Sequence, residues 1–163
     1  MRSEAEELQT IATRHLRWGW TLLALFVVLG ICLEAMHGFK VDWYLHASNE
    51  TRRLTWRLAH AHGTFLAIVH LLFGQTVDRL KSVPRRLGWI SSGISVASLF
   101  VPLGFFLGGL KIYDGDPGPG IALLPVGALV LLVALVDFAL AMPEARLARS
   151  AADSSAGRST RTS

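Results

Sequence analysis

The sequence has little charge and almost no cysteine, and each shortage excludes a class of protein. Charged residues make up 17% of the 163 positions, whereas hydrophobic residues make up 52%. This balance excludes an intrinsically disordered chain and is too apolar for an ordinary soluble domain. The single cysteine, Cys32, cannot form a disulfide within the chain, so the sequence leaves the redox compartment open.

The chain instead contains long runs of apolar residues. They cover approximately residues 18–36, 54–75, 87–110 and 120–142. Each is close to the ~20 residues that a helix needs to cross a bilayer core of ~30 Å. The first run contains Glu34 and is longer than the core of a cleavable signal peptide, so we expect it to be retained. The sequence predicts an all-α, integral membrane four-helix bundle over residues 1–150 and a disordered tail over residues 151–163.

The net charge of +4 comes from basic residues that lie beside the apolar runs. One side of the predicted membrane holds most of them: Arg2, Arg14, Arg17, Arg79, Lys81, Arg85, Arg86, Arg146, Arg149, Arg158 and Arg161. Basic residues in short loops favour the cytoplasmic side, so this bias predicts that both termini are cytoplasmic, in a bacterial inner (plasma) membrane. No nucleic-acid motif accompanies the basic residues, and we expect no nucleic-acid partner.

Three segments outside the apolar runs carry local signals. Ser3 and Glu6 have the spacing of a capping box, which predicts a cytoplasmic helix that continues into the first span. Residues 37–49 are polar and aromatic and are long enough to fold over the mouth of the bundle. Residues 113–120 are rich in glycine, proline and aspartate, which favours tight turns over a cation site.

The second apolar run also contains three histidines. At 3.6 residues per turn, His60 and His62 differ by about 200° around a helix, so they are poor candidates for one shared metal. One polar stripe consists of Arg53, Arg57, His60 and Thr64. His62 and His70 belong to a different face of the same helix. The sequence therefore predicts at least two separate roles for these histidines.

Two further polar pairs have both a structural and a functional interpretation. Glu34 and His37 are spaced i, i+3 near the outer end of the first span. This spacing occurs among metal ligands in helical bundles, and it also suits a simple hydrogen-bonded pair. His70 and Asp137 both lie in the inner halves of their spans, so a His70–Asp137 pair would satisfy two polar groups in lipid.

His60 lies about one turn inside the outer boundary of its span, where neighbouring Gly63 leaves space for a planar ligand. An imidazole is a standard axial ligand of haem iron. The residues alone leave three roles open for His60: a haem ligand, a ligand of another metal, and a hydrogen-bonded histidine of the core.

Three short motifs resemble a family of small four-span membrane proteins. The run RLAHAHGTFLA at residues 57–67 resembles the second-helix motif of the family that contains styrene oxide isomerase and hydroxylaminobenzene mutase. RRLGW at residues 85–89 resembles the entry to that family's third helix, and GPG at residues 118–120 resembles the turn before its fourth. The resemblance implies a homo-oligomer, for example a trimer, with haem b at the protomer interface. It implies His60 as the axial ligand, with His62 as the rival because glycine follows it directly.

The resemblance also implies a reaction and the residues around it. Ferric haem in this family acts as a Lewis acid that rearranges a small apolar substrate, such as an epoxide or a hydroxylamine. Glu34 and His37 are then candidate polar groups near the pocket, and the family's asparagine six residues after the histidine is Leu66 here. Arg53 and Arg57 would pair with the haem propionates or extend to lipid headgroups.

The alternative function is not enzymatic. The chain would then be a haem- or metal-binding protein, or a structural subunit of a larger membrane assembly. Its histidines would form hydrogen bonds between helices in the lipid bilayer.

Overall fold

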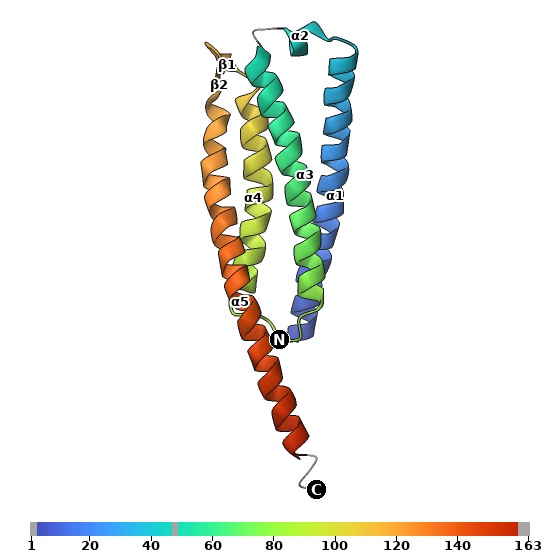
Figure 1. Cartoon of the computed structure of the whole chain (residues 1–163), viewed down its shortest axis with the longest axis vertical. Helices are drawn as coiled ribbons and strands as arrows, with labels where there is room; N and C mark the ends of the chain where they lie inside the picture. Colours follow the sequence, from blue (N-terminus) through green and yellow to red (C-terminus); the bar gives the residue numbers. More distant parts are fainter. Residues whose placement is uncertain (1–2, 47–48, 160–163) are drawn as a thin grey trace.

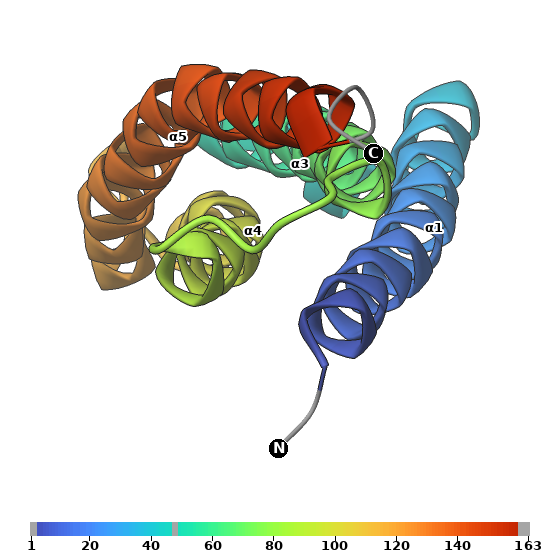
Figure 2. The ribbon, with the colours of Figure 1, turned by 90° about the horizontal axis from the view of Figure 1, so that it is seen from below.

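The computed structural model describes residues 3–46 and 49–159, and four long helices of these residues lie side by side (Figure 1). They are α1 (Glu4–Gly38), α3 (Glu50–Asp78), α4 (Leu87–Gly108) and α5 (Leu123–Ser159). Each packs on the next in chain order, and the view along the bundle places α3 between α1 and α4 (Figure 2). The all-α prediction is confirmed.

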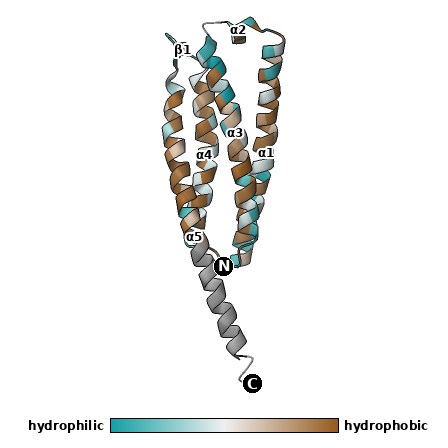
Figure 3. Ribbon diagram, in the orientation of Figure 1, coloured by the Kyte–Doolittle hydropathy of each residue, from teal (hydrophilic) through white to brown (hydrophobic). Residues whose placement is uncertain are grey.

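Three helical segments of the described residues are long and apolar enough to cross a membrane. They are Glu4–Gly38, Leu87–Gly108 and Pro119–Met142, the last of which joins the 3-10 turn η2 (Pro119–Ala122) to the first part of α5. They correspond to three of the four predicted spans, and the third span ends two residues earlier than predicted. α3 contains the other predicted span but is not among them. Its first turns carry arginines and are hydrophilic (Figure 3), and His60, His62 and His70 lower the hydropathy of the segment beyond them.

The N-terminal end of the chain matches the sequence-based expectation, whereas the C-terminal end is more helical than expected. The capping box at the start of α1 is confirmed, since Ser3 Oγ accepts from the Glu6 N–H at 3.3 Å and the Glu6 carboxylate accepts from the Ser3 N–H at 3.1 Å. At the other end, α5 continues as far as Ser159, through most of the segment predicted to be disordered. Alanine in that segment favours helix. Residues 160–163 lie outside the described residues.

A short helix and a hairpin close the end of the bundle that lies away from the N-terminus (Figure 1). They are α2 (Asp42–Leu45) and the antiparallel pair β1 (Ile112–Tyr113) and β2 (Asp116–Pro117). Buried Arg52 of α3 fastens both connections, because it donates to the carbonyls of Gly109 at 3.0 Å and Trp43 at 3.2 Å. Its guanidinium also lies 4.5 Å from the centroid of the Trp43 ring, within the range of a cation–π contact.

The hairpin turn follows the prediction for its segment. Asp114 and Gly115 have φ angles of 50° and 93°, in the left-handed region that glycine and aspartate adopt most easily in tight turns.

The core gathers at the two ends of α3 and is thinner between them. One cluster contains Leu8 and Ile11 of α1, with residues of α3, α4 and α5. The other contains Leu33, Tyr44 and Trp56, whose indole N–H donates to the Phe106 carbonyl at 3.0 Å. Glycines bring α1 and α3 close in between. A Cβ added to Gly19, for example, would lie 3.1 Å from the Ala67 carbonyl oxygen.

Candidate functional site

A cleft of about 1150 Å³ lies between α1 and α3 near α2. Five residues selected from the sequence line it together: Glu34, His37, Arg53, Arg57 and His60. The remaining lining is aliphatic apart from Gly30 and Tyr44. Its volume is somewhat above the ~300–1,000 Å³ typical of sites for small molecules and cofactors. The structure therefore brings two imidazoles, a carboxylate and two guanidinium groups to one apolar cleft.

His60 is held in this cleft through one of its two ring nitrogens. Its Nδ1 lies 2.7 Å from the carbonyl oxygen of Phe26 in α1. A carbonyl only accepts, so Nδ1 carries the proton and Nε2 carries a lone pair. Nε2 has no hydrogen-bond partner in the described structure, and it is not among the buried unpaired atoms, so it is accessible. A carbonyl that fixes the tautomer in this way is the usual support of a metal-binding histidine.

Gly30 makes the position of the His60 ring possible. A Cβ added at Gly30 would lie 2.6 Å from His60 Cε1 and 3.2 Å from Nε2, so any larger residue would displace the ring. The sequence analysis did not select Gly30. It lies four residues before Glu34 on α1, which is one helical turn and therefore the same face.

The two arginines of the cleft differ in whether their guanidinium groups already donate hydrogen bonds within the protein. Arg53 Nη1 donates to the carbonyls of Leu45 and His46, both at 2.9 Å, and so holds the C-terminal end of α2. Arg57 is exposed and forms no hydrogen bond or salt bridge within the described residues. Arg57 is therefore the arginine whose donors remain available to an anionic group.

Glu34 and His37 reach the cleft from the exposed face of α1. No hydrogen bond joins them within the described residues, so the hydrogen-bonded pair suggested by their spacing does not form. Tyr44 completes this side of the cleft and is 2% exposed. Burial raises the pKa of its phenol above the ordinary value, against a smaller opposite effect of Arg57 and Arg53. Tyr44 is therefore a neutral donor at neutral pH.

His62 and Gly63 lie outside the cleft. His62 Nδ1 donates to the Leu58 carbonyl at 2.9 Å, and its ring packs against Phe105 of α4, with centroids 4.8 Å apart. The prediction that His60 and His62 face different neighbours is confirmed. The space predicted beside Gly63 is already filled, because an added Cβ would lie 2.2 Å from the Phe26 ring. Gly63 serves helix packing, and the prediction that it adjoins a planar ligand is wrong.

A second polar cluster is buried at the other end of α3. His15 of α1 and His70 of α3 are 1% and 0% exposed, and their rings stack with centroids 4.6 Å apart. His15 Nε2 lies 2.7 Å from Ser91 Oγ, and His70 Nε2 lies 3.1 Å from Ser98 Oγ. Both serines belong to α4, so the cluster joins three helices.

The hydrogen bonds assign a tautomer to His70. Ser98 Oγ–H donates to the Ser95 carbonyl at 2.8 Å, so Ser98 can only accept from His70. His70 therefore carries its proton on Nε2 and a lone pair on Nδ1. The Nδ1 atoms of His15 and His70 are both buried without a hydrogen-bond partner in the described structure.

The predicted pairing of His70 with Asp137 is wrong. Asp137 of α5 accepts from Arg86 Nη1 at 2.9 Å. His70 faces α1 and α4 instead, where a histidine and a serine take the place of the carboxylate.

His15 was not among the residues predicted from the sequence, although the chain contains a signal for it. The buried residues of α1 recur every three or four positions: Leu8, Ile11, Ala12, His15, Gly19, Leu22 and Phe26. His15 lies in this apolar stripe, and the stripe is what turns a helix face toward its neighbours. His15 precedes the first apolar run at residues 18–36, so hydropathy alone does not place it among the buried residues of a span.

The described residues contain no group of three or more histidine, cysteine, aspartate or glutamate side chains arranged to hold a metal ion. A scan of protein-family models and searches of curated proteins and solved structures found no match to the chain.

Proposed function

We propose that this chain is a four-helix protein of a bacterial inner membrane that binds haem b through His60 and rearranges a small apolar substrate within one molecule. Both termini would be cytoplasmic and α3 would be the fourth span, enclosed by α1 and α4. The observation that carries the proposal is the accessible Nε2 lone pair of His60 in a cleft with a free arginine.

The residues of the cleft fit a haem in three respects. Phe26 fixes the His60 tautomer that leaves Nε2 free to bind iron. Apolar residues form most of the walls, as a porphyrin ring requires. Arg57 has unused donors that suit a propionate, whereas Arg53 is engaged by α2. We therefore assign the propionate contact to Arg57 and a structural role to Arg53.

When bound, ferric haem supplies a Lewis acid for the oxygen of an epoxide or a hydroxylamine. The chain itself supplies the orientation of the substrate. Leu66 is 1% exposed and replaces the asparagine of the resembled family, so it offers no polar group to the cleft. Glu34 and His37 are the polar side chains of α1 that line the cleft, and they are placed to hold a polar group of the substrate or exchange a proton with it.

An absorption spectrum of the purified full chain tests the haem site. We expect a Soret band that is lost in His60→Ala and restored by added imidazole, which replaces the missing ligand. His62→Ala is the matched control, because it removes a histidine of the same helix that lies outside the cleft. Colourless protein from haem-replete cells contradicts the proposal. Loss of the band in His62→Ala alone transfers the axial role to His62.

Turnover of an aryl epoxide or an aryl hydroxylamine tests the enzyme. Glu34→Gln is expected to lower turnover at least tenfold without moving the Soret band, since a positioned acid or base typically contributes 10²–10⁴-fold. A coloured protein that converts neither substrate supports a haem carrier instead.

One observation favours the non-enzymatic function. His15, His60 and His70 each join two helices through a hydrogen bond. A structural subunit would use them in this way and would show no haem spectrum.

A further inference from the structure

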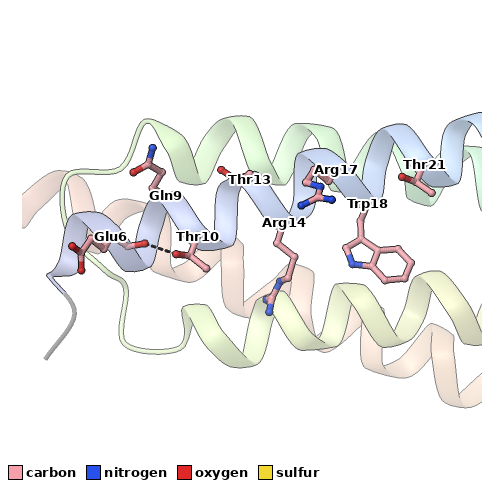
Figure 4. A pocket seen from close by; sticks show the side chains of 8 residues that line it. All are labelled: Glu6, Gln9, Thr10, Thr13, Arg14, Arg17, Trp18 and Thr21. Atoms are coloured by element: carbon pink, nitrogen blue, oxygen red, sulfur yellow. Dashed lines mark hydrogen bonds between the residues drawn. The ribbon is translucent and has the colours of Figure 1, made fainter.

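The end of α1 opposite the His60 cleft borders two adjoining clefts. One, of about 730 Å³, runs along α1 from Glu6 to Thr21, and the other, of about 280 Å³, lies between α1 and α4. Arg14 and Trp18 line both clefts, so the two adjoin at these side chains, and together they are called the groove below. Figure 4 shows these two side chains pointing from α1 toward α4.

Arg14 does not extend away from the protein as a basic residue at a membrane boundary usually does. Its Nη2 reaches across the groove and donates to Ser91 Oγ of α4. Ser91 is fully buried and is also bonded to His15, so the buried cluster anchors the guanidinium in the groove. An arginine has five donors, and this contact uses one of them.

The positive charge of the groove has no carboxylate partner. Arg14 and Arg17 line the same cleft three residues apart, and neither forms a salt bridge within the described residues. Glu6, at the far end, is engaged by the Ser3 N–H in the capping box. Two guanidinium groups on one helix face, with free donors, suit the oxygens of a phosphate.

The narrower part of the groove, which Arg14 also lines, combines apolar side chains with serines. Trp18 of α1 and Val96 and Leu99 of α4 supply its apolar surface. The hydroxyls of Ser92, Ser95 and Ser98 donate to carbonyls of their own helix. The apolar residues follow Arg14 and Ser91 in sequence on two helices that both run away from the N-terminal end (Figure 1). A ligand that fills the groove therefore needs an anionic head and an apolar tail.

We propose that this groove binds an anionic phospholipid, with Arg14 and Arg17 on its phosphate and an acyl chain along Trp18, Val96 and Leu99. A phosphate ion offers the same oxygens but nothing for the apolar part of the groove. The flanking helices α1 and α4 are both long and apolar enough to lie in a bilayer, where such a lipid is at hand. Basic pockets between membrane helices are known sites for anionic headgroups.

Native mass spectrometry of the full chain with phosphatidylglycerol or phosphatidylcholine tests this site. We expect phosphatidylglycerol to remain bound in preference to phosphatidylcholine. Arg14→Gln and Arg17→Gln should each weaken its binding about fivefold. The matched controls are the single variants Arg79→Gln and Arg85→Gln. Each removes one positive charge at an exposed position outside the groove.

Three outcomes would overturn the proposal. They are equal retention of the two lipids, equal losses in the groove and control variants, and a melting temperature that rises with inorganic phosphate but not with phosphatidylglycerol. The last would identify a site for free phosphate. Arg17→Gln guards against misfolding, because Arg17 is exposed and contacts no other described residue through a hydrogen bond. None of these readouts depends on haem, so the test stands apart from the proposed function.

Discussion

The two ends of α3 use histidine in opposite ways. At one end His60 is hydrogen-bonded through one nitrogen and exposes the other to a cleft formed by two helices. At the other end His70 is also hydrogen-bonded through one nitrogen, but its second nitrogen is enclosed by α1, α3 and α4. The difference lies in what surrounds the free nitrogen. An accessible lone pair can bind a ligand, whereas an enclosed one can contact only the side chains packed around it.

The largest effect on stability should come from removing the enclosed histidine. His70→Ala leaves a cavity among three helices and removes the partner of Ser98, which should lower the free energy of unfolding by about 3 kcal/mol. His60→Ala removes one hydrogen bond at an open cleft and should cost about 1 kcal/mol. Chemical denaturation in detergent measures both. Equal losses would show that the two ends do not differ as described.

A smaller loss of stability is expected at Gly63, which was predicted to adjoin a ligand but packs against α1 in the structure. Gly63→Ala places a Cβ on the Phe26 ring and should destabilise the protein by about 2 kcal/mol through overpacking. Gly88→Ala is the control, because an added Cβ there meets nothing within 4 Å. Thermal unfolding compares the two variants. A Gly63→Ala variant as stable as the control would indicate that the space beside Gly63 is open.

Gly30→Ala should separate ligand binding from stability. The added carbon pushes against the edge of the His60 ring at the cleft, where the ring has room to move. We expect haem occupancy to fall several-fold while the free energy of unfolding changes by less than about 1 kcal/mol. The Soret absorbance per protein and the melting temperature give the two quantities. An unchanged spectrum would mean that the His60 position observed here is not needed for the ligand.

The smallest effect should follow from breaking the salt bridge between Arg86 and Asp137. Arg86 is 68% exposed, so water screens the pair and its loss should cost less than about 1 kcal/mol. Arg86→Gln should also leave the environment of His70 unchanged in NMR spectra, because His70 pairs with Ser98 instead. A shift of the His70 resonances would indicate a coupling to Asp137 that the contacts do not show.

Much of the fold could be predicted from hydropathy. Three predicted spans agree with α1, α4 and the segment 119–142, because each has a continuous apolar run. The span in α3 was also predicted from its apolar run, but the hydrogen bonds by which Arg52 and Trp56 join this helix to its neighbours were not. No local pattern reveals such contacts, because their partners are carbonyls of other elements.

The candidate site, too, could be predicted from the sequence only in part. Helical spacing predicted that Arg53, Arg57 and His60 share a face, and the cleft brings them together with Glu34 and His37 of α1. Spacing could not predict that Phe26 would cover Gly63, or that Gly30 would face His60, because both depend on how α1 is rotated against α3. The same rotation places His15 on His70 rather than leaving His70 for Asp137.

His60 and His70 stand ten residues apart on one uninterrupted helix. At a rise of 1.5 Å per residue they are separated by about 15 Å along its axis. Their hydrogen-bond partners, Phe26 and Ser98, belong to different helices, so either histidine can be replaced without touching the partner of the other.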